Sequence, residues 1–419
     1  MASNWTTYKI GDLFELQNGF AFKGTDFIDE GVPVIKIKNV KAGKILLSDL
    51  SYVSREVADK AKRFLIKPND ILITMSGNRM DGSPETWVGK VSLFQEAGEY
   101  LLNQRVGILK PKLGVDVNVE FCAYSLSSWY YQNHFINAAN SSGGQANISP
   151  STILNTDIYL PDRDTQNEIS SVLKSLDESI RNNESIISIS EEITRVLFRE
   201  WFGNKLTTIT SQATESEFIN SPADWVLGPI GKLASIQNGY SFKSDDFEPS
   251  GHNAVIKIKN ISNNTVDISK TDFVNESIVK NTDKKFQIYS GSLLIAMTGA
   301  EVGKIGFVPD TSKKLWLNQR VGMFIEKIKY SSYYLFLLLS TDLYQSSLQN
   351  AALGSAQPNI SGTAIENIKA LIPPHYIIKE FGEIADPFFQ LRFSKITENH
   401  DLSKLKESLV PYLTIPNEF

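Results

Sequence analysis

The segment GAEVGKIG, from Gly299 to Gly306, carries the residue types of a phosphate-binding loop. Such a loop has four residues between its first glycine and the Gly-Lys pair, and a serine or threonine follows the lysine to hold magnesium. Here three residues separate Gly299 from Gly303, and Ile305 follows the lysine. The spacing therefore argues against nucleotide binding.

No other segment carries a recognisable catalytic set. The motif IPPHY, at Ile372–Tyr376, has the two prolines of an amino-methyltransferase loop but lacks the Asn or Asp before them. The chain has one cysteine, Cys122, and four scattered histidines, which do not predict a disulfide or a zinc site. We expect neither a catalytic nor a metal site in this chain.

The segment LNQRVG occurs twice, at Leu102–Gly107 and again 215 positions later at Leu317–Gly322. Further matches follow in the same order: IGDLFELQNGFAFK with IGKLASIQNGYSFK, VIKIKNV with VIKIKNI, NDILITMSG with GSLLIAMTG, VGKV with VGKI, and QANIS with QPNIS. Repeats of about 20–50 residues indicate solenoids. This much longer period instead predicts two duplicated domains.

Each copy has the same internal order. Segments such as VPVIKIKNV, DILITMSG and NQRVGILKP alternate β-branched and polar residues between Gly and Asn turns, which is typical of short strands. A helical segment follows, VNVEFCAYSLSSWYYQNHF in one copy and SSYYLFLLLSTDLYQSSLQNAA in the other. A turn and one more strand, ending at a proline, complete a predicted β-rich head.

Each copy ends in a long amphipathic segment. Asp164–Phe202 has neither glycine nor proline, and its apolar residues recur every three or four positions, which predicts a helix on the order of 55 Å long. Ile377–Leu413 repeats the pattern, and Pro387 within it predicts a late start or a kink. Each helix could pack on its own head, but one apolar stripe on each favours an antiparallel coiled coil between them. The predicted interface residues are Leu173, Leu176, Ile180, Ile193, Leu197, Phe381, Phe388, Leu402, Leu405 and Leu409.

These patterns predict an α+β fold with two duplicated β-rich domains separated by two long antiparallel helices, with approximate two-fold symmetry. The predicted division is 1–161 for the first head, 162–203 for its helix, 204–223 for a linker, 224–373 for the second head and 374–419 for its helix. The N-terminus lacks a signal-peptide pattern, and YYLFLLL, the longest apolar cluster, is too short to span a bilayer. We therefore expect a cytoplasmic protein without a membrane contact.

The order of these motifs resembles the specificity subunit of type I restriction-modification systems, the HsdS family, over nearly the whole chain. The resemblance rests on two W-x-x-x-x-I/L-x-x-L openings (Trp5 to Leu13 and Trp225 to Leu233), the QNGFAFK and QNGYSFK segments, the LNQRVG strands, the GGQANIS and SAQPNIS turns, and the helix ends ITRVLFREWF and LSKLKESLVPYL. It implies two target recognition domains, each reading one half of a bipartite site in double-stranded DNA.

The resemblance also implies partners. The helices would fix the distance between the half-sites and dock two methyltransferase subunits, with restriction subunits added in the full complex. S-adenosylmethionine, ATP and magnesium would be bound by those partners and none by this chain. The chain would direct adenine methylation and DNA cleavage without catalysing either.

Residues that the two heads share cannot distinguish two different half-sites, so shared cations are predicted to be scaffold or contacts to phosphates. Because the net charge is −5, nucleic-acid binding would depend on such local basic faces. Lys36 and Lys38 are expected on one face of a strand. Each lysine could instead be an ordinary solvated residue, and Arg105 and Arg320 could brace the fold. The candidates are Lys23, Lys36, Lys38, Lys90, Arg105, Lys243, Lys257, Lys259, Lys304, Lys313, Lys314 and Arg320.

Base reading is expected where the copies differ. Between Gly77 and Gly89 the first copy has NRMDGSPETWV, where the second has only AEV. Arginine pairs with guanine, asparagine with adenine, and carboxylates accept from cytosine. An ordinary surface loop is the alternative reading. The base-reading candidates are Asn78, Arg79, Asp81, Ser83 and Glu85 in the first copy, and Asn263 and Asn264 in the second.

Two other classes of function stay open at this point. A protein-interaction scaffold would use two β-rich heads and the helices without binding DNA. An enzyme with an unrecognised site would act as the purified chain alone.

Overall fold

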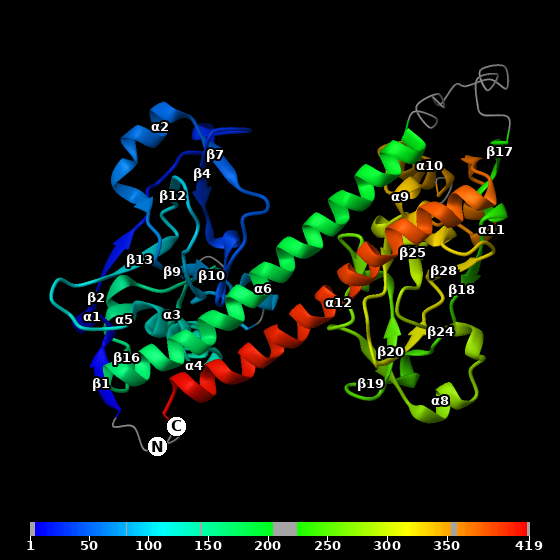
Figure 1. The fold of residues 1–419 in the computed structure, drawn as a ribbon. Coiled ribbons are helices and arrows are strands. Elements are labelled where there is room, and N and C mark those ends of the chain that lie inside the picture. The colour runs from blue at the N-terminus through cyan, green and yellow to red at the C-terminus, as the bar shows by residue number, and fades with distance from the viewer. Residues whose placement is uncertain (1–4, 81, 143–144, 204–223, 353–357, 417–419) are drawn as a thin grey trace. The chain divides into compact units, whose positions relative to one another are not determined.

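The computed structural model describes residues 5–80, 82–142, 145–203, 224–352 and 358–416 (Figure 1). Contacts within the chain form two compact units: unit 1 contains residues 1–178 and 402–419, and unit 2 contains residues 179–401. Each unit therefore includes part of both long helices, in contrast to the predicted five-part division. The predicted linker, 204–223, lies outside the described residues.

Unit 1 is built on two sheets. One is antiparallel, in the order β11 (Val91–Leu93), β9 (Ile71–Thr74), β13 (Val106–Pro111) and β2 (Phe14–Asn18). The other has the order β3 (Phe27–Ile28), β7 (Ser51–Val53), β4 (Val32–Ile35), β12 (Tyr100–Leu102) and β8 (Leu65–Ile66), and β4 runs parallel to β12. Ile71 and Ile73 enter one buried cluster and Leu72 enters another, because strand side chains alternate between faces. Both faces of β9 are thus covered.

Smaller elements complete unit 1. Two pairs of strands form separate antiparallel two-stranded sheets: β1 (Thr6–Lys9) with β16 (Asp157–Leu160), and β5 (Val40–Lys41) with β6 (Lys44–Ile45). A three-stranded sheet has the order β10 (Ser76–Gly77), β15 (Gln145–Asn147) and β14 (Asn140–Ser142). The short helices are α1 (Ile10–Leu13), α2 (Arg55–Lys60), α3 (Val119–Ser127), α4 (Trp129–Ala138) and α5 (Pro150–Leu154).

Unit 2 repeats this architecture. Its first sheet has the order β18 (Ala234–Asn238), β28 (Val321–Glu326), β25 (Leu293–Ala296), β26 (Ile305–Phe307), β22 (Thr265–Val266) and β21 (Ile261–Ser262). The second has the order β19 (Phe247–Glu248), β23 (Asp272–Val274), β20 (Asn253–Ile256), β27 (Lys314–Leu317) and β24 (Gln287–Ile288), and β17 (Val226–Pro229) pairs with β29 (Lys369–Ile372). The helices are α8 (Glu276–Lys280), α9 (Ser331–Leu339), α10 (Asp342–Ala351) and α11 (Gly362–Glu366). The matching strand orders confirm the duplication predicted from the sequence.

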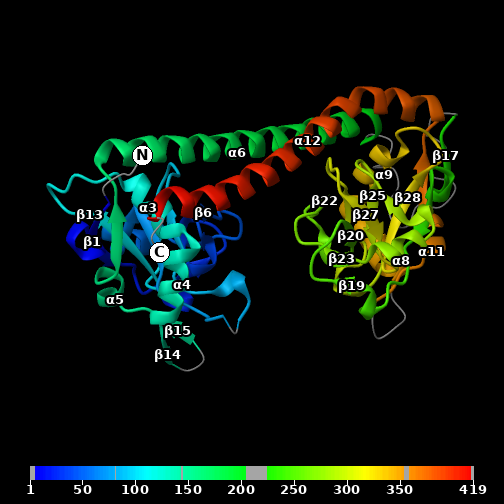
Figure 2. The same cartoon turned by 90° about the horizontal axis from the view of Figure 1, so that it is seen from below.

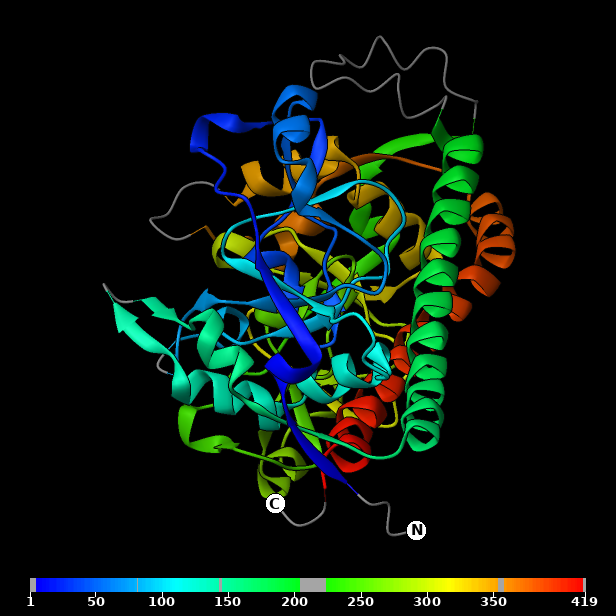
Figure 3. The same ribbon diagram turned by 90° about the vertical axis from the view of Figure 1, so that its left-hand side faces the viewer.

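The two long helices are α6 (Arg163–Phe198) and α12 (His375–Thr414). In unit 1, Lys406 of α12 pairs with Asp177 of α6. Figure 3 shows the C-terminal end of α12, in red, beside the long green helix α6. In unit 2, the amide of Asn399 donates to the carbonyl of Ile180 at 3.1 Å, and Arg392 pairs with Glu191 at 2.8 Å. From the first of these contacts to the second, the residue number falls along α12, from 399 to 392, and rises along α6, from 180 to 191. The helices therefore pack antiparallel, as predicted.

Pro387 does not delay the second helix, which begins at His375. Of the two effects expected of Pro387, a late start or a kink, the late start is therefore wrong. A proline inside a helix removes one hydrogen bond and bends the axis. Figure 2 shows a bend in the first half of α12, the half that contains Pro387.

The predicted helix-interface residues fall into three groups. Leu173 and Phe381 are fully buried, and Leu176, Leu197 and Leu409 pack against buried clusters. Ile180, Ile193, Phe388 and Leu402 are half-buried. Leu405, however, is 47% exposed, so its assignment to the interface was wrong. The helix turns the next residue, Lys406, towards α6 instead, where Asp177 neutralises it.

Candidate nucleic-acid interface

The repeated LNQRVG segment forms a tight corner between two strands. In unit 1 it ends β12, makes a turn at 103–105 and begins β13. The N–H of Gln104 donates to the carbonyl of Phe20 at 2.9 Å. In unit 2 the N–H of Gln319 donates to the carbonyl of Tyr240 at 2.8 Å. The corner is thus clamped to the QNG segment by backbone hydrogen bonds, which explains why both copies keep it.

Arg105 braces this corner in unit 1. Its guanidinium donates to the hydroxyl of Ser76 and to the side-chain carbonyl of Asn147, both at 3.3 Å. The Ser76 hydroxyl also donates to Asn147 at 2.6 Å. In unit 2, Thr298 and Asn359 stand at the positions of Ser76 and Asn147, and they form a β-bridge through their backbones. The exposed guanidinium of Arg320 has no hydrogen bond or ion pair to the part of the chain that the structure describes, so Arg320 stays a phosphate candidate.

The described residues of the loop that is longer in unit 1 are joined by internal hydrogen bonds. Asn78 closes it, because its backbone N–H donates to the carbonyl of Thr86 at 2.8 Å and its amide donates to the Thr86 hydroxyl at 3.0 Å. Trp87 donates to the carbonyl of Gly82 at 2.8 Å and its ring lies 5.6 Å from that of Trp129 on α4. Asn78 is therefore a loop-closing residue rather than a free base reader.

The other loop candidates are more accessible. Arg79 is exposed, and its guanidinium donates one hydrogen bond to the carbonyl of Ala139 at the end of α4. Ser83 and Glu85 are exposed as well. Asp81 lies outside the described residues. The loop thus presents Arg79, Ser83 and Glu85 from a rigid support.

Lys90 supports this loop from beneath. It is 6% exposed, and its ammonium group donates to the carbonyl of Glu85 at 2.5 Å. Burial and, to a smaller extent, the nearby Lys41 cation lower its pKa to about 8. The prediction that Lys90 contacts a phosphate is therefore wrong, because the loop covers it. The sequence signal for this burial is the long segment NRMDGSPETWV before Gly89-Lys90. The second copy has only AEV before Gly303-Lys304.

The lowered pKa of Lys90 predicts a pH dependence of stability. In the unfolded chain its pKa is about 10.4, so between about pH 8 and pH 10 the unfolded state binds more protons. Unfolding free energy therefore rises with pH in this window. Between pH 7.5 and pH 10, the unfolding free energy of the unaltered chain should rise by on the order of 2 kcal/mol more than that of Lys90→Met. Urea unfolding at pH 7.5, 9 and 10 measures this, and parallel curves for the two proteins would contradict it.

The paired lysines of VIKIKNV do not lie on a strand as predicted. Strand β4 ends at Ile35, and Ile37–Asn39 forms a 3-10 helix. Asn39 causes this turn, because its side chain accepts the N–H of Lys36 at 3.0 Å and donates to the carbonyl of Leu46 at 3.0 Å. Lys36 and Lys38 therefore do not share a strand face, and that prediction is wrong.

These lysines also have partners within the fold. The ammonium of Lys36 lies 3.4 Å from the centre of the Phe27 ring, and burial lowers its pKa, with the nearby Lys38 cation lowering it further. Lys38 pairs with Asp49 at 2.7 Å. In unit 2, Lys257 and Lys259 both pair with Asp272, at 2.9 and 3.0 Å. Part of their charge is thus neutralised by the protein.

The remaining cations differ in accessibility. Lys304 pairs with Glu301, and Lys313 donates to the carbonyl of Ile268 at 2.8 Å. Lys23, Lys243 and Lys314 are exposed, as is Lys304 beside its Glu301 partner. Lys23, Lys243 and Lys314 are not in an ion pair with any described residue. Together with Arg320, they form the set of backbone candidates that the structure leaves most accessible.

Asn263 and Asn264 form the turn between β21 and β22, both with positive φ angles of 49° and 60°. The carbonyl of Asn264 accepts a hydrogen bond from Arg392 of α12 at 2.9 Å. This turn therefore packs on the long helix. Asparagine suits this turn because it tolerates the left-handed conformation that a tight hairpin requires. The hydrogen bond uses only the backbone of Asn264, and Asn263 is exposed, so base reading by these two side chains stays a prediction.

The acidic, histidine and cysteine side chains bear on metal binding and nucleophilic chemistry. Among the described residues, no cluster of three or more His, Cys, Asp and Glu side chains is placed to hold a metal ion. The Cys122 thiol is fully buried, which raises its pKa and keeps it protonated. None of the described helices combines the length and apolar character that crossing a bilayer would need.

Comparison with known proteins decides the family. The model of the type I restriction modification DNA specificity domain matches residues 2–192 and 222–406. The chain belongs to this family. The two matched segments each contain one of the repeated corners, so family and duplication agree.

Individual relatives cover the full length. The type I restriction enzyme MjaVIII specificity subunit of Methanocaldococcus jannaschii is 23% identical and covers 98% of this chain and 92% of its own. The HindI specificity subunit of Haemophilus influenzae is 23% identical, covering 98% and 99%. The crystal structure of a type I restriction-modification S subunit from M. genitalium matches with a TM-score of 0.64 at 17% identity, over 100% of this chain and 98% of that chain. This likeness shows the shared fold.

Proposed function

We propose that this chain is the DNA sequence-specificity subunit of a type I restriction-modification complex. Each head reads one part of an asymmetric bipartite site in double-stranded DNA. The observation that carries this proposal is the duplicated head. Both copies have the same hydrogen-bonded corner, but the loops beside it differ in length. The chain also belongs to the specificity-domain family. A common scaffold with different loops suits two different half-sites.

We further propose that the chain is not itself catalytic. Two methyltransferase subunits, and restriction subunits in the full complex, supply the chemistry and hold S-adenosylmethionine, ATP and magnesium. The fully buried thiol and the missing P-loop spacing support this division of labour. The chain contributes DNA sequence choice and a docking surface for these partners.

Exposed apolar residues on α12 support the docking role. In unit 2, Ile384 is 46% exposed and Leu391, seven residues later, is 40% exposed. In unit 1, Leu405 and Tyr412 repeat the same spacing at 47% and 69%. A seven-residue apolar period is the pattern by which one helix packs on another. We assign these residues to contacts with helices of the methyltransferase subunits.

Changing Ile384 and Leu391 together to glutamate should reduce co-purification of the methyltransferase subunit by about tenfold or more, since each buried aliphatic contact contributes about 1–2 kcal/mol. Binding of the isolated chain to DNA should persist. Ile28→Glu, at an equally exposed isoleucine of β3, is the matched control. Unchanged co-purification of the double variant would refute the docking assignment.

Arg79→Ala tests the base-reading assignment. If the free donors of this guanidinium reach a guanine, the variant should relax one position of one half-site, with about 10- to 100-fold less discrimination. The other half-site should stay unchanged. Arg55→Ala, at an exposed arginine of α2, is the control. The motif methylated by each complex is the readout. An unchanged motif with Arg79→Ala, together with an altered motif for Lys36→Ala, would overturn the assignment.

A further inference from the structure

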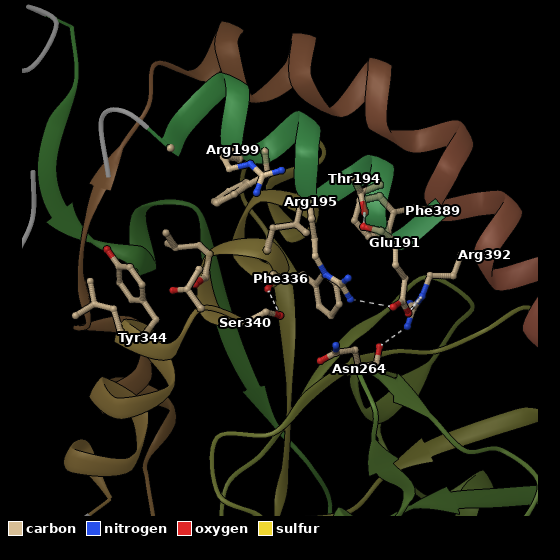
Figure 4. A pocket seen from close by; sticks show the side chains of 16 residues that line it. Glu191, Thr194, Arg195, Arg199, Asn264, Phe336, Ser340, Tyr344, Phe389 and Arg392 are labelled. Atoms are coloured by element: carbon tan, nitrogen blue, oxygen red, sulfur yellow. Dashed lines mark hydrogen bonds and ion pairs between the residues drawn. The ribbon is translucent and has the colours of Figure 1, made fainter. Parts of the chain in front are cut away.

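Unit 2 contains a cavity that the DNA-reading role does not use. Its volume is about 460 Å³, and it lies between the end of α6, the helices α9 and α10, and α12. Figure 4 shows Arg195 and Arg199 on the α6 side and Phe336, Ser340 and Tyr344 opposite. Small-molecule sites typically have volumes of about 300–1,000 Å³. The cavity therefore has the size of a ligand site.

The walls of the cavity are mostly apolar. Phe336, Leu337 and Leu338 of α9 line one side, and Phe198 of α6 and Phe389 of α12 line the others. All five side chains are at most 7% exposed, so the surrounding core holds them in place. Such walls fit the apolar body of a ligand.

One end of the cavity is cationic. The lining includes three arginines, Arg195, Arg199 and Arg392, and one carboxylate, Glu191. Glu191 holds Arg392 at 2.8 Å and Arg195 at 3.0 Å. The exposed Arg199 makes no hydrogen bond or ion pair to any residue that the structure describes. The lining therefore carries more positive than negative charge.

Arg392 carries an unsatisfied donor. Its residue is 2% exposed, its Nε pairs with Glu191 and one terminal nitrogen donates to the carbonyl of Asn264. Its other terminal nitrogen, Nη1, is buried and has no hydrogen-bond partner among the described residues. A buried donor without an acceptor is costly and rare. An anionic group bound in the cavity would supply an acceptor close to this arginine.

Each unit has a tyrosine–aspartate contact between its helices. In unit 1 the hydroxyl of Tyr124 on α3 donates to Asp177 at 2.8 Å, and Lys406 donates to the same carboxylate at 2.5 Å. In unit 2 the hydroxyl of Tyr333 on α9 donates to Asp386 of α12 at 2.6 Å. Neither Tyr333 nor Asp386 lines the cavity, so the arginine end of the cavity is separate from this contact.

We propose that this cavity binds a small amphipathic anion, with its apolar body against α9 and its single negative charge at the arginine end. This proposal does not depend on the DNA-specificity role. Because α6 and α12 both contribute to the walls, the bound anion would bridge the two long helices within unit 2.

Calorimetric titration of the full chain with three probes of equal chain length tests this. Decanoate should bind with one site per chain, while decan-1-ol and decyltrimethylammonium should bind at least about tenfold more weakly, because they lack the charge that the arginines recognise. Equal affinity for the three probes, or no saturable binding of decanoate, would overturn the proposal.

Two substitutions place the site. Leu343→Trp, at a 38% exposed cavity residue, should fill the cavity and weaken decanoate at least about tenfold, whereas Ile325→Trp, at a 42% exposed residue outside it, should change the affinity less than about twofold. Arg199→Gln should weaken decanoate about three- to tenfold, and Lys379→Gln serves as its control. Thermal unfolding verifies that each variant is folded. If Leu343→Trp is folded and binds decanoate normally, the assigned cavity is wrong.

Discussion

Replacing Gly19 with alanine is expected to lower the melting temperature of unit 1 by about 2–12 °C. A Cβ at this position would lie 2.3 Å from the carbonyl oxygen of Asn103, in the repeated corner. That neighbour is backbone, fixed by the hydrogen bonds that clamp the corner, so it has little room to move. Overpacking costs about 1–3 kcal/mol, and each kcal/mol shifts a unit of this size by about 2–4 °C.

Gly24→Ala is the matched control, since nothing lies within 4 Å of a Cβ built there. Gly239→Ala should repeat the effect in unit 2, where the corresponding distance to the Asn318 carbonyl oxygen is 2.1 Å. Differential scanning calorimetry measures each transition. Equal melting temperatures for Gly19→Ala and Gly24→Ala would show that the corner is not the rigid element described here.

Replacing Glu191 with alanine should have a still larger effect, a loss of about 3–5 kcal/mol from the unfolding free energy of unit 2. The reason is Arg392, which is 2% exposed and would remain buried without its 2.8 Å ion pair. Removing one partner of a buried pair costs more than the pair itself contributes, because a charge is left in an apolar site. Denaturant unfolding at neutral pH measures this loss.

Two further variants distinguish the effect of the unpaired buried charge from that of losing a carboxylate on the helix surface. Glu192→Ala removes a neighbouring carboxylate that is 61% exposed, so its effect should be under about 1 kcal/mol. The double variant Glu191→Leu with Arg392→Met removes both charges and should recover most of the lost stability. A double variant as unstable as Glu191→Ala alone would rule out the buried charge as the cause.

The repeat made most of the fold predictable. Identical corners, matching strand patterns and two long amphipathic segments were sufficient to predict two β-rich heads and an antiparallel helix pair. The helix bounds were also close, because Asp164–Phe202 contains neither glycine nor proline, and the structure has a helix at Arg163–Phe198. Periodicity predicts elements well when nothing interrupts it.

The misses have local physical causes. The alternation in VIKIKNV is that of a strand, but the side chain of Asn39 captures the N–H of Lys36 and turns the chain. Lys90 was expected at the surface because its cover is a loop, whose path cannot be read from residue spacing. Leu405 fits the apolar stripe of its helix, yet Lys406 is the residue that meets Asp177. In each case a specific side-chain contact decided against the periodic pattern.

The candidate site was less predictable than the fold. Comparing the two copies identified the loop with Arg79, Ser83 and Glu85, which the structure shows on a braced support. The same comparison could have found Asn147, which both copies keep in QANIS and QPNIS and which joins Arg105 to Ser76. The partners of the shared lysines could not be found this way, because ion pairs such as Lys38 with Asp49 depend on the folded path of the chain.

Methylation-sensitive sequencing of the genome that encodes this chain tests the central claim most directly. We predict one asymmetric bipartite motif with methylated adenines, which is present when the gene is intact and disappears from the genome when the gene is deleted. A motif that persists after deletion, or a palindromic motif with two identical halves, would contradict the proposal that two different heads each read one half-site.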